Sequence, residues 1–183
     1  MNKSIDYFLL LIKGVEELNL LVQIDKEMVT YISSIRAREL SYLLGRMQAL
    51  SLQRCVVLTA ALLDKKSSKH HDKTSIPLLF RHLKKTNLIS KSVKEFSDKK
   101  ISELKSIYDA CKHYRDKFVA HIENVSIVES HILGFSQFAI AAQNLSDLCD
   151  LISNEVFSRK YLVERTFERL AEIQQLKKLS SNL

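Results

Sequence analysis

The sequence contains few residues that interrupt regular structure. Its 183 residues include three Gly, one Pro and no Trp. Because Gly and Pro mark most sharp turns, the chain has few places for them. Leu, Ile, Lys, Glu, Ala and Ser dominate, and runs typical of strands are nearly absent. The composition therefore predicts long helices joined by short connections.

The chain also lacks paired cysteines. Cys55, Cys111 and Cys149 are odd in number, far apart and embedded in apolar helical patterns. Their spacing fits neither a disulfide framework nor a zinc site, so we expect three small core residues in a reducing compartment.

Long hydrophobic runs are missing as well. The apolar run Phe8–Ile12 is bracketed by Asp6 and Lys13 and has no cleavage site of small residues after it. The longest uncharged stretch, 130–146, contains several polar side chains and is a poor membrane span. We therefore expect a cytoplasmic protein without a membrane segment.

The length favours one domain with one sizeable core. Apolar residues recur at three- and four-residue steps, as in amphipathic helices, over residues 5–22 (continuing towards Ile35), 40–62, about 92–121 and 128–156. A short helix is expected through Leu83, because Ser75-Ile76-Pro77 is typical of a helix start. We predict an all-α, up-and-down bundle of four to five long helices over residues 1–157. Residues 158–183 would add an amphipathic C-terminal helix, either packed on the bundle or docking on a partner.

The periodicity also predicts which residues are buried. In the first helix these are Ile5, Phe8, Ile12, Val15, Leu18 and Val22. In the second they are Leu40, Leu44, Met47, Ser51, Cys55, Leu58 and Leu62. In the fourth they are Ile101, Leu104, Tyr108, Cys111, Arg115, Phe118 and Ile122. In the fifth they are Val128, Ile132, Phe135, Ala139, Ala142, Leu145, Cys149, Ile152 and Val156.

The positive charge is concentrated in the middle of the chain. The formal net charge is +7, yet residues 65–117 hold 15 Lys/Arg against 6 Asp/Glu, a local excess of +9. A basic block of this kind is expected for a protein that binds a polyanion such as RNA. A solvated, lysine-rich surface is an equally good interpretation.

One charged residue lies on a predicted apolar stripe. Arg115 occupies that position, and His121 follows six residues later with Phe118 between them. A buried arginine is costly unless its charge is paired or directed into a wet cleft. The pattern therefore predicts either an internal salt bridge or a functional edge that contains Arg115 and His121.

The segment Arg115-Asp116-Lys117-Phe118-Val119-Ala120-His121 resembles the motif of the HEPN superfamily, in particular its abortive-infection-related, AbiU-like branch. In that motif an Arg is followed, after four to six residues, by a His near the end of a long helix. Leu62-Leu63-Asp64, a polar loop and Ser75-Ile76-Pro77-Leu78-Leu79 are similar to the same families. The resemblance covers roughly residues 5–155. In the family a basic or polar residue and an acid often follow the His, whereas here Ile122 and then Glu123 follow it.

The resemblance implies a homodimer in which the two motifs face each other across a cleft. It implies a metal-independent endoribonuclease without cofactors, acting in phage defence or as a toxin and leaving a 2′,3′-cyclic phosphate. His121 would be the general base on a ribose 2′-hydroxyl, and Arg115 would stabilise the charge on the phosphorane. Asp116 would orient the His or bind a ribose hydroxyl, unless it pairs with Lys112. RNA and a possible antitoxin or other protein partner are expected, and no DNA specificity is inferred.

Two other functions remain open. The chain could be a non-catalytic HEPN-like dimer that binds RNA or a protein, with Arg115 and His121 in structural roles. It could also be an interaction module whose last helix docks on a partner.

Other polar residues offer weaker candidates. His70-His71-Asp72 is better explained as solvated loop residues than as metal ligands, and we assign no metal. His113 is expected to be a partly exposed helical residue. Arg54 is expected to form either a further phosphate contact or a salt bridge at the edge of the core. No Gly-rich phosphate loop and no Gly-x-Ser-x-Gly motif is present.

Overall fold

The fold is built from helices. The computed structural model describes residues 2–32, 38–65, 75–116, 133–158 and 161–165, together with Gln175 and Lys178. Over these ranges it contains no strand, which confirms the all-α prediction. The helices are α1 (Asn2–Ile32), α2 (Arg38–Leu63), α3 (Ile76–Lys85), α4 (Lys91–Glu103), α5 (Lys105–Tyr114) and α6 (Phe135–Phe157).

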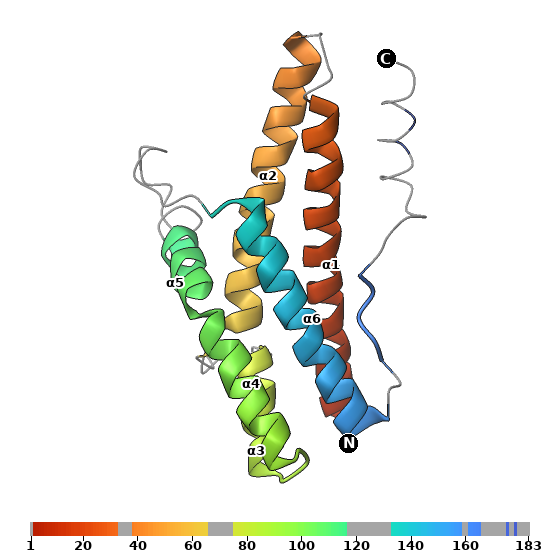
Figure 1. The fold of residues 1–183 in the computed structure, drawn as a ribbon, viewed down its shortest axis with the longest axis vertical. Coiled ribbons are helices and arrows are strands. Elements are labelled where there is room, and N and C mark those ends of the chain that lie inside the picture. Colours follow the sequence, from red (N-terminus) through yellow and green to blue (C-terminus); the bar gives the residue numbers. More distant parts are fainter. Residues whose placement is uncertain are drawn as a thin grey trace.

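The two longest helices, α1 and α2, form an antiparallel hairpin (Figure 1). Helix α6 packs mainly on α1, and α5 packs on α2. Helices α3 and α4 contact each other and α6 at the end of the molecule where α1 begins (Figure 1). The space enclosed by these helices is the hydrophobic core.

The core confirms much of the predicted burial pattern. Phe8, Val15 and Leu18 of α1 are fully buried, and all three cysteines are buried and free. Other large, fully buried side chains come from α2, α3, α6 and the α4–α5 junction: Leu63, Ile76, Phe80, Leu104, Phe138, Leu145, Leu148 and Ile152.

Among the predicted core positions whose side chains the structure describes, two are wrong. Met47 of α2 is 49% exposed, because the neighbouring Gln48 faces α1, where its Nε2 donates a hydrogen bond to Asp25 Oδ1 at 2.5 Å. Ala139 of α6 is exposed, because the buried face begins one position earlier, at Phe138. Both errors exchange a residue for its immediate neighbour on the helix.

The helix predicted over 92–121 is divided in two. The chain bends at Leu104, which ends α4 and whose side chain is fully buried. The bend allows α4 to pack on α3 and α6 while α5 packs on α2. Arg115 and Asp116 continue α5 in a wider helical turn, and residues 117–121 lie outside the described part of the chain.

The start of α3 agrees with the prediction. Ser75 is the N-cap, and its Oγ accepts a hydrogen bond from the Leu78 N–H at 3.4 Å, with Pro77 in the first turn. The same hydroxyl donates to the carbonyl of Asp64. Ser75 therefore fixes the end of α2 next to the start of α3.

The segment after α6 is attached to the bundle without being helical. Ser158 ends α6 in a left-handed conformation (φ 53°). Beyond it, the Val163 N–H donates to Asp150 Oδ1 at 3.0 Å, and Arg165 Nη2 lies 2.6 Å from Asp150 Oδ2. Residues 161–165, which lie within the C-terminal helix predicted over 158–183, are therefore not helical. Of the remaining positions only Gln175 and Lys178 are described, and both are helical.

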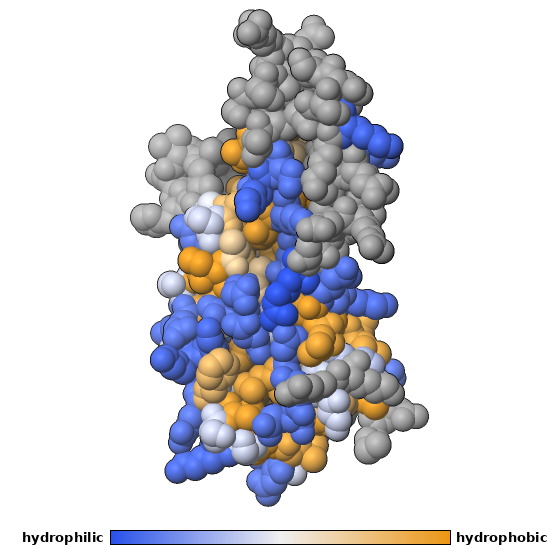
Figure 2. All heavy atoms as spheres, turned by 45° about the vertical axis from the view of Figure 1, so that its right-hand side comes forward, coloured by the Kyte–Doolittle hydropathy of each residue, from blue (hydrophilic) through white to orange (hydrophobic). Residues whose placement is uncertain are grey.

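The visible surface mixes polar and apolar residues. Figure 2 shows hydrophilic side chains interleaved with smaller apolar patches over the described part of one face. No helix in the described ranges is both long enough and apolar enough to cross a membrane.

Candidate functional site

Four side chains, from helix α5 and from the residues that follow α2 and α5, meet where α2 ends. Asp64 directly follows α2, Tyr108 lies within α5, and Arg115 and Asp116 follow α5. Tyr108 and Arg115 are seven residues apart and therefore share one face of the helix. We call this cluster of Asp64, Tyr108, Arg115 and Asp116 the acid–arginine edge.

Arg115 is held by two carboxylates. Its Nε and Nη2 donate to Asp116 Oδ1 at 3.0 and 2.8 Å, and its Nη1 lies 3.8 Å from Asp64 Oδ2. The arginine side chain is 26% exposed, compared with 14% for Asp64 and 52% for Asp116. The predicted internal salt bridge is therefore present, and it replaces the suggested pairing of Asp116 with Lys112. The guanidinium nevertheless remains accessible to solvent.

Tyr108 connects this ion pair to the core. Its hydroxyl donates a hydrogen bond to Asp64 Oδ1 at 3.4 Å, and its ring belongs to the hydrophobic core. Burial raises the pKa of Tyr108, and the negative charge of Asp64 raises it further. Tyr108 is thus a neutral donor at physiological pH, and it helps to orient the Asp64 carboxylate.

Asp64 is positioned by its backbone as well. The bond from Ser75 Oγ to its carbonyl ties the end of α2 to the cap of α3. In the sequence, Asp64 stood out only as part of the segment Leu62-Leu63-Asp64 that resembles the HEPN families, and Tyr108 only as a predicted core residue. One signal in the sequence could have indicated this site. Tyr108 lies on the same apolar stripe as Arg115, and a buried tyrosine hydroxyl needs a hydrogen-bond partner.

Several residues that the sequence singled out, as a site residue, a core residue or a rejected metal candidate, lie outside the described part of the chain. They are His121, Phe118, His70, His71 and Asp72. The geometry between Arg115 and His121 is therefore not part of the observed site. The observed site consists of the arginine and its acids, immediately before the segment that contains the histidine.

Two further candidates lie in the described part. Arg54 forms a two-pronged pair with Glu17 of α1, with Nε–Oε1 at 2.6 Å and Nη2–Oε2 at 3.0 Å. This contact agrees with the salt bridge that was one of its two predicted roles. His113 is exposed in the last turn of α5, also as predicted.

Part of the basic block is already paired. Lys84 lies 2.5 Å from Asp98, and Lys100 donates to Asn144 Oδ1 at 2.6 Å and lies 3.8 Å from Asp147. Over the described residues, no three His, Cys, Asp or Glu side chains are grouped as metal ligands. The acid–arginine edge therefore offers one accessible guanidinium, two carboxylates and the Tyr108 hydroxyl.

Comparison with known proteins found no match to this chain. The acid–arginine edge must therefore be interpreted from its own residues and contacts. The chain matches no protein-family model, and no curated protein or solved structure is significantly similar to it.

Proposed function

We propose that this chain is a HEPN-type, metal-independent endoribonuclease that acts as a homodimer, in phage defence or as a toxin. The observation that carries the proposal is the state of Arg115. Its guanidinium is fixed by Asp64 and Asp116, yet it is 26% exposed and lies six residues before His121. An arginine that is both oriented and accessible is suited to binding a phosphate.

The proposed reaction needs only the side chains of this motif and water. His121 removes the proton from a ribose 2′-hydroxyl, and the 2′-oxygen attacks the adjacent phosphorus. Arg115 stabilises the negative charge that develops on the phosphorane oxygens. The bond to the 5′-oxygen breaks, and that oxygen takes a proton from water. The products are a 2′,3′-cyclic phosphate and a free 5′-hydroxyl.

The two carboxylates have different expected roles. Asp64 is mostly buried and remains the fixed partner of Arg115, whereas Asp116 is half exposed. A phosphate oxygen can replace Asp116 on the guanidinium, because both present an anionic acceptor to the same N–H groups. Asp116 would then be free to bind a ribose hydroxyl. The net charge of +9 over residues 65–117 would attract RNA towards this edge.

The test is cleavage of single-stranded RNA by the purified full chain in the presence of EDTA. His121→Ala should lower the rate by about a hundredfold or more, the usual contribution of a general base. Arg115→Lys should also lower it, because lysine lacks the planar fork of donors. His113→Ala is the matched control, since His113 is an exposed histidine on the preceding helix. Unchanged cleavage by the His121 variant would overturn the proposal.

A non-catalytic HEPN-like dimer that binds RNA or a protein is the second candidate. The pairing of Arg115 with two acids favours it, because that pairing neutralises the guanidinium and gives it a structural role. In this case RNA should bind with a steep dependence on salt and remain intact. The same assay distinguishes the two functions, since the wild-type protein either cuts the RNA or does not.

A further inference from the structure

Residues 161–165, which follow α6, contact the bundle as a bound peptide would. Figure 1 shows them as an elongated stretch alongside α1. Val163 is buried, whereas Leu162 and Glu164 on either side of it are exposed. This alternation is typical of an extended chain, in which successive side chains point to opposite sides. We call residues 161–165 the tail segment.

The main chain of the tail segment is bound by side chains of the two helices beneath it. Four hydrogen bonds make this contact: Tyr161 N–H to Ser153 Oγ (2.9 Å), Val163 N–H to Asp150 Oδ1 (3.0 Å), Glu164 N–H to Glu16 Oε1 (3.1 Å) and Asn19 Nδ2 to the Glu164 carbonyl (3.3 Å). Bonds to the main chain do not depend on the side chains of the bound segment. Another extended peptide could therefore make the same four bonds.

Two side chains of the tail segment add specificity. Val163 joins the edge of the hydrophobic core. Arg165 Nη2 lies 2.6 Å from Asp150 Oδ2 and 3.3 Å from Asp147 Oδ1. Lys100, 3.8 Å from Asp147, balances only one of these two carboxylates. The surface therefore favours an aliphatic residue followed two positions later by an arginine. We call Glu16, Asn19, Asp147, Asp150 and Ser153 the tail site.

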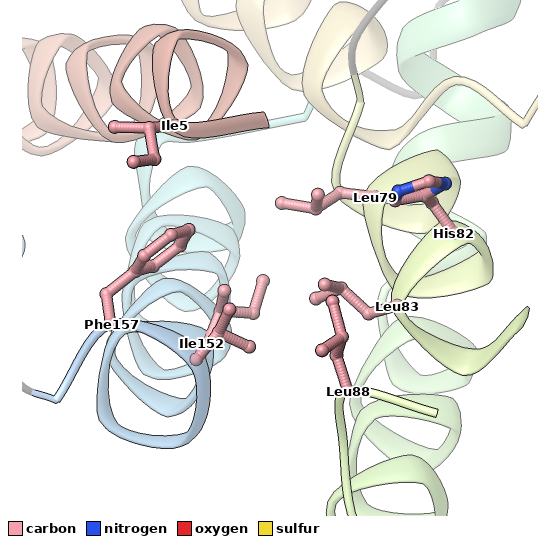
Figure 3. Close-up of a pocket in the computed structure, with 8 residues that line it drawn as sticks. Ile5, Leu79, His82, Leu83, Leu88, Ile152 and Phe157 are labelled. Atoms are coloured by element: carbon pink, nitrogen blue, oxygen red, sulfur yellow. The ribbon is translucent and has the colours of Figure 1, made fainter. Parts of the chain in front are cut away.

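The start of the tail segment packs on aromatic rings. Tyr161 meets the edge of Phe157 at a centroid distance of 5.7 Å and that of Phe8 at 6.5 Å. Phe157 also lines an apolar pocket of about 310 Å³, and Leu88 lies on the other side of this pocket (Figure 3). The eight described residues that line the pocket do not include Tyr161. Leu88 is therefore a suitable control position, close to the tail site but outside it.

The tail segment covers little of the core. Of its five residues only Val163 is buried, and Leu162 is 58% exposed. A segment with so few buried contacts opens at a lower free energy than the whole fold. It can therefore leave the bundle while the helices stay packed.

We propose that the tail site binds an extended segment of a partner protein, and that the tail segment occupies this site until the partner displaces it. The partner segment carries an aliphatic residue two positions before an arginine, as Val163 and Arg165 do here. It competes with a tethered ligand whose effective concentration is on the order of millimolar. The proposal is independent of RNA cleavage, because the tail site shares no residue with the acid–arginine edge.

The probe is a fluorescein-labelled peptide with the sequence of residues 159–167, added to the full chain and followed by fluorescence anisotropy. Val163→Asp places a charge at a buried position and should release the chain's own tail. Arg165→Glu places a third carboxylate against Asp147 and Asp150, should have the same effect, and decides the test if the first variant folds poorly. Each variant should bind the peptide about tenfold or more tightly than the wild type, because the tethered competitor is gone.

Two further peptides test what the site recognises. A scrambled peptide of the same composition should not bind the released variants, which excludes attraction by net charge alone. A peptide that keeps only Tyr161, Val163 and Arg165, with alanine elsewhere, should bind within about threefold of the first peptide, because the other contacts are made by the main chain. Binding of the complete sequence alone would overturn the proposal of a partner protein and favour a second copy of this chain.

Variants of the site complete the test. In either released variant, Asp150→Ala should weaken peptide binding about tenfold, because Asp150 binds both the Val163 N–H and Arg165. Leu88→Ala is the matched control and should leave binding unchanged. Released variants that fold, as judged by circular dichroism, but bind no better than the wild type would overturn the proposal. Loss of folding in both would also overturn it, since the tail segment would then be a structural part of the bundle.

Discussion

The hydrophobic core and the acid–arginine edge are held together by different forces. The core is apolar and shared by every described helix, and its large side chains, such as Leu145, Phe138 and Leu18, are fully buried. The edge is polar and partly exposed, and it depends on the ion pair between Arg115 and Asp64. Burial of apolar area contributes more to stability than a partly solvated ion pair. The core should therefore determine stability, whereas the edge is free to serve another purpose.

The largest effect is expected in the core. Leu145→Ala should lower the free energy of unfolding by about 3 kcal/mol, because it removes buried methyl groups and leaves a cavity among fully buried neighbours. Chemical denaturation followed by circular dichroism measures the loss. Ile140→Ala on the same helix is the control, since Ile140 is 56% exposed and should cost less than about 0.5 kcal/mol. Similar losses for both variants would contradict the assignment of the core.

A smaller effect is expected at the edge. Arg115→Ala should lower the free energy of unfolding by about 1 kcal/mol, because Asp64, 14% exposed, loses its cation. Asp116→Ala should cost less, since that carboxylate is half exposed and its pairing is screened by water. The same denaturation experiment measures both. A loss for Arg115→Ala as large as that for Leu145→Ala would mean that the edge is part of the structural core.

The sequence predicted these two regions to different extents. Phe8, Val15 and Leu18 were predicted to be buried because burial on a helix follows its 3.6-residue period. The prediction that Met47 is buried was wrong because Met47 and Gln48 fit the helical period about equally well. The choice between them depends on Asp25, which lies on another helix.

The acid–arginine edge was predicted only in part for a similar reason. Arg115 was identified because a charge interrupted an apolar stripe of its own helix. Its partner Asp64 lies after α2, and periodicity within one helix carries no information on which other helix packs beside it. The bend at Leu104, which brings α5 against α2, likewise depends on tertiary packing and not on a Gly or Pro.

The stability of the protein at alkaline pH tests the contribution of Tyr108 at the acid–arginine edge. Because burial and Asp64 raise the pKa of Tyr108, the folded protein keeps this proton at a pH where the unfolded chain has lost it. The free energy of unfolding should therefore fall as pH rises above about 10, the ordinary tyrosine value, and it should fall more steeply than in Tyr108→Phe. The three buried cysteines, whose pKa values burial also raises, are common to both proteins and cancel in the difference.

The contribution of Asp64 to this pKa can be measured directly. In Asp64→Asn, the ultraviolet absorbance of tyrosinate from Tyr108 should appear at a lower pH than in the wild type, because the neighbouring negative charge is gone. Burial remains, so its pKa should stay above the ordinary value. Subtracting the titration of Tyr108→Phe isolates this residue from the other five tyrosines. An unchanged titration would show that Asp64 does not act on Tyr108.

The smallest effect is expected at Arg54, which provides a second arginine–carboxylate pair for comparison with Arg115. Arg54 and Glu17 form two short contacts, but their side chains are 52% and 38% exposed. Arg54→Ala should therefore lower the free energy of unfolding by less than about 0.5 kcal/mol, and added salt should reduce the difference further. Arg54 lies on α2 and pairs with α1, so the variant should cut RNA at the wild-type rate if cleavage occurs at the acid–arginine edge. A loss of cleavage in Arg54→Ala with no loss of stability would instead place the RNA-binding surface on the α1–α2 hairpin.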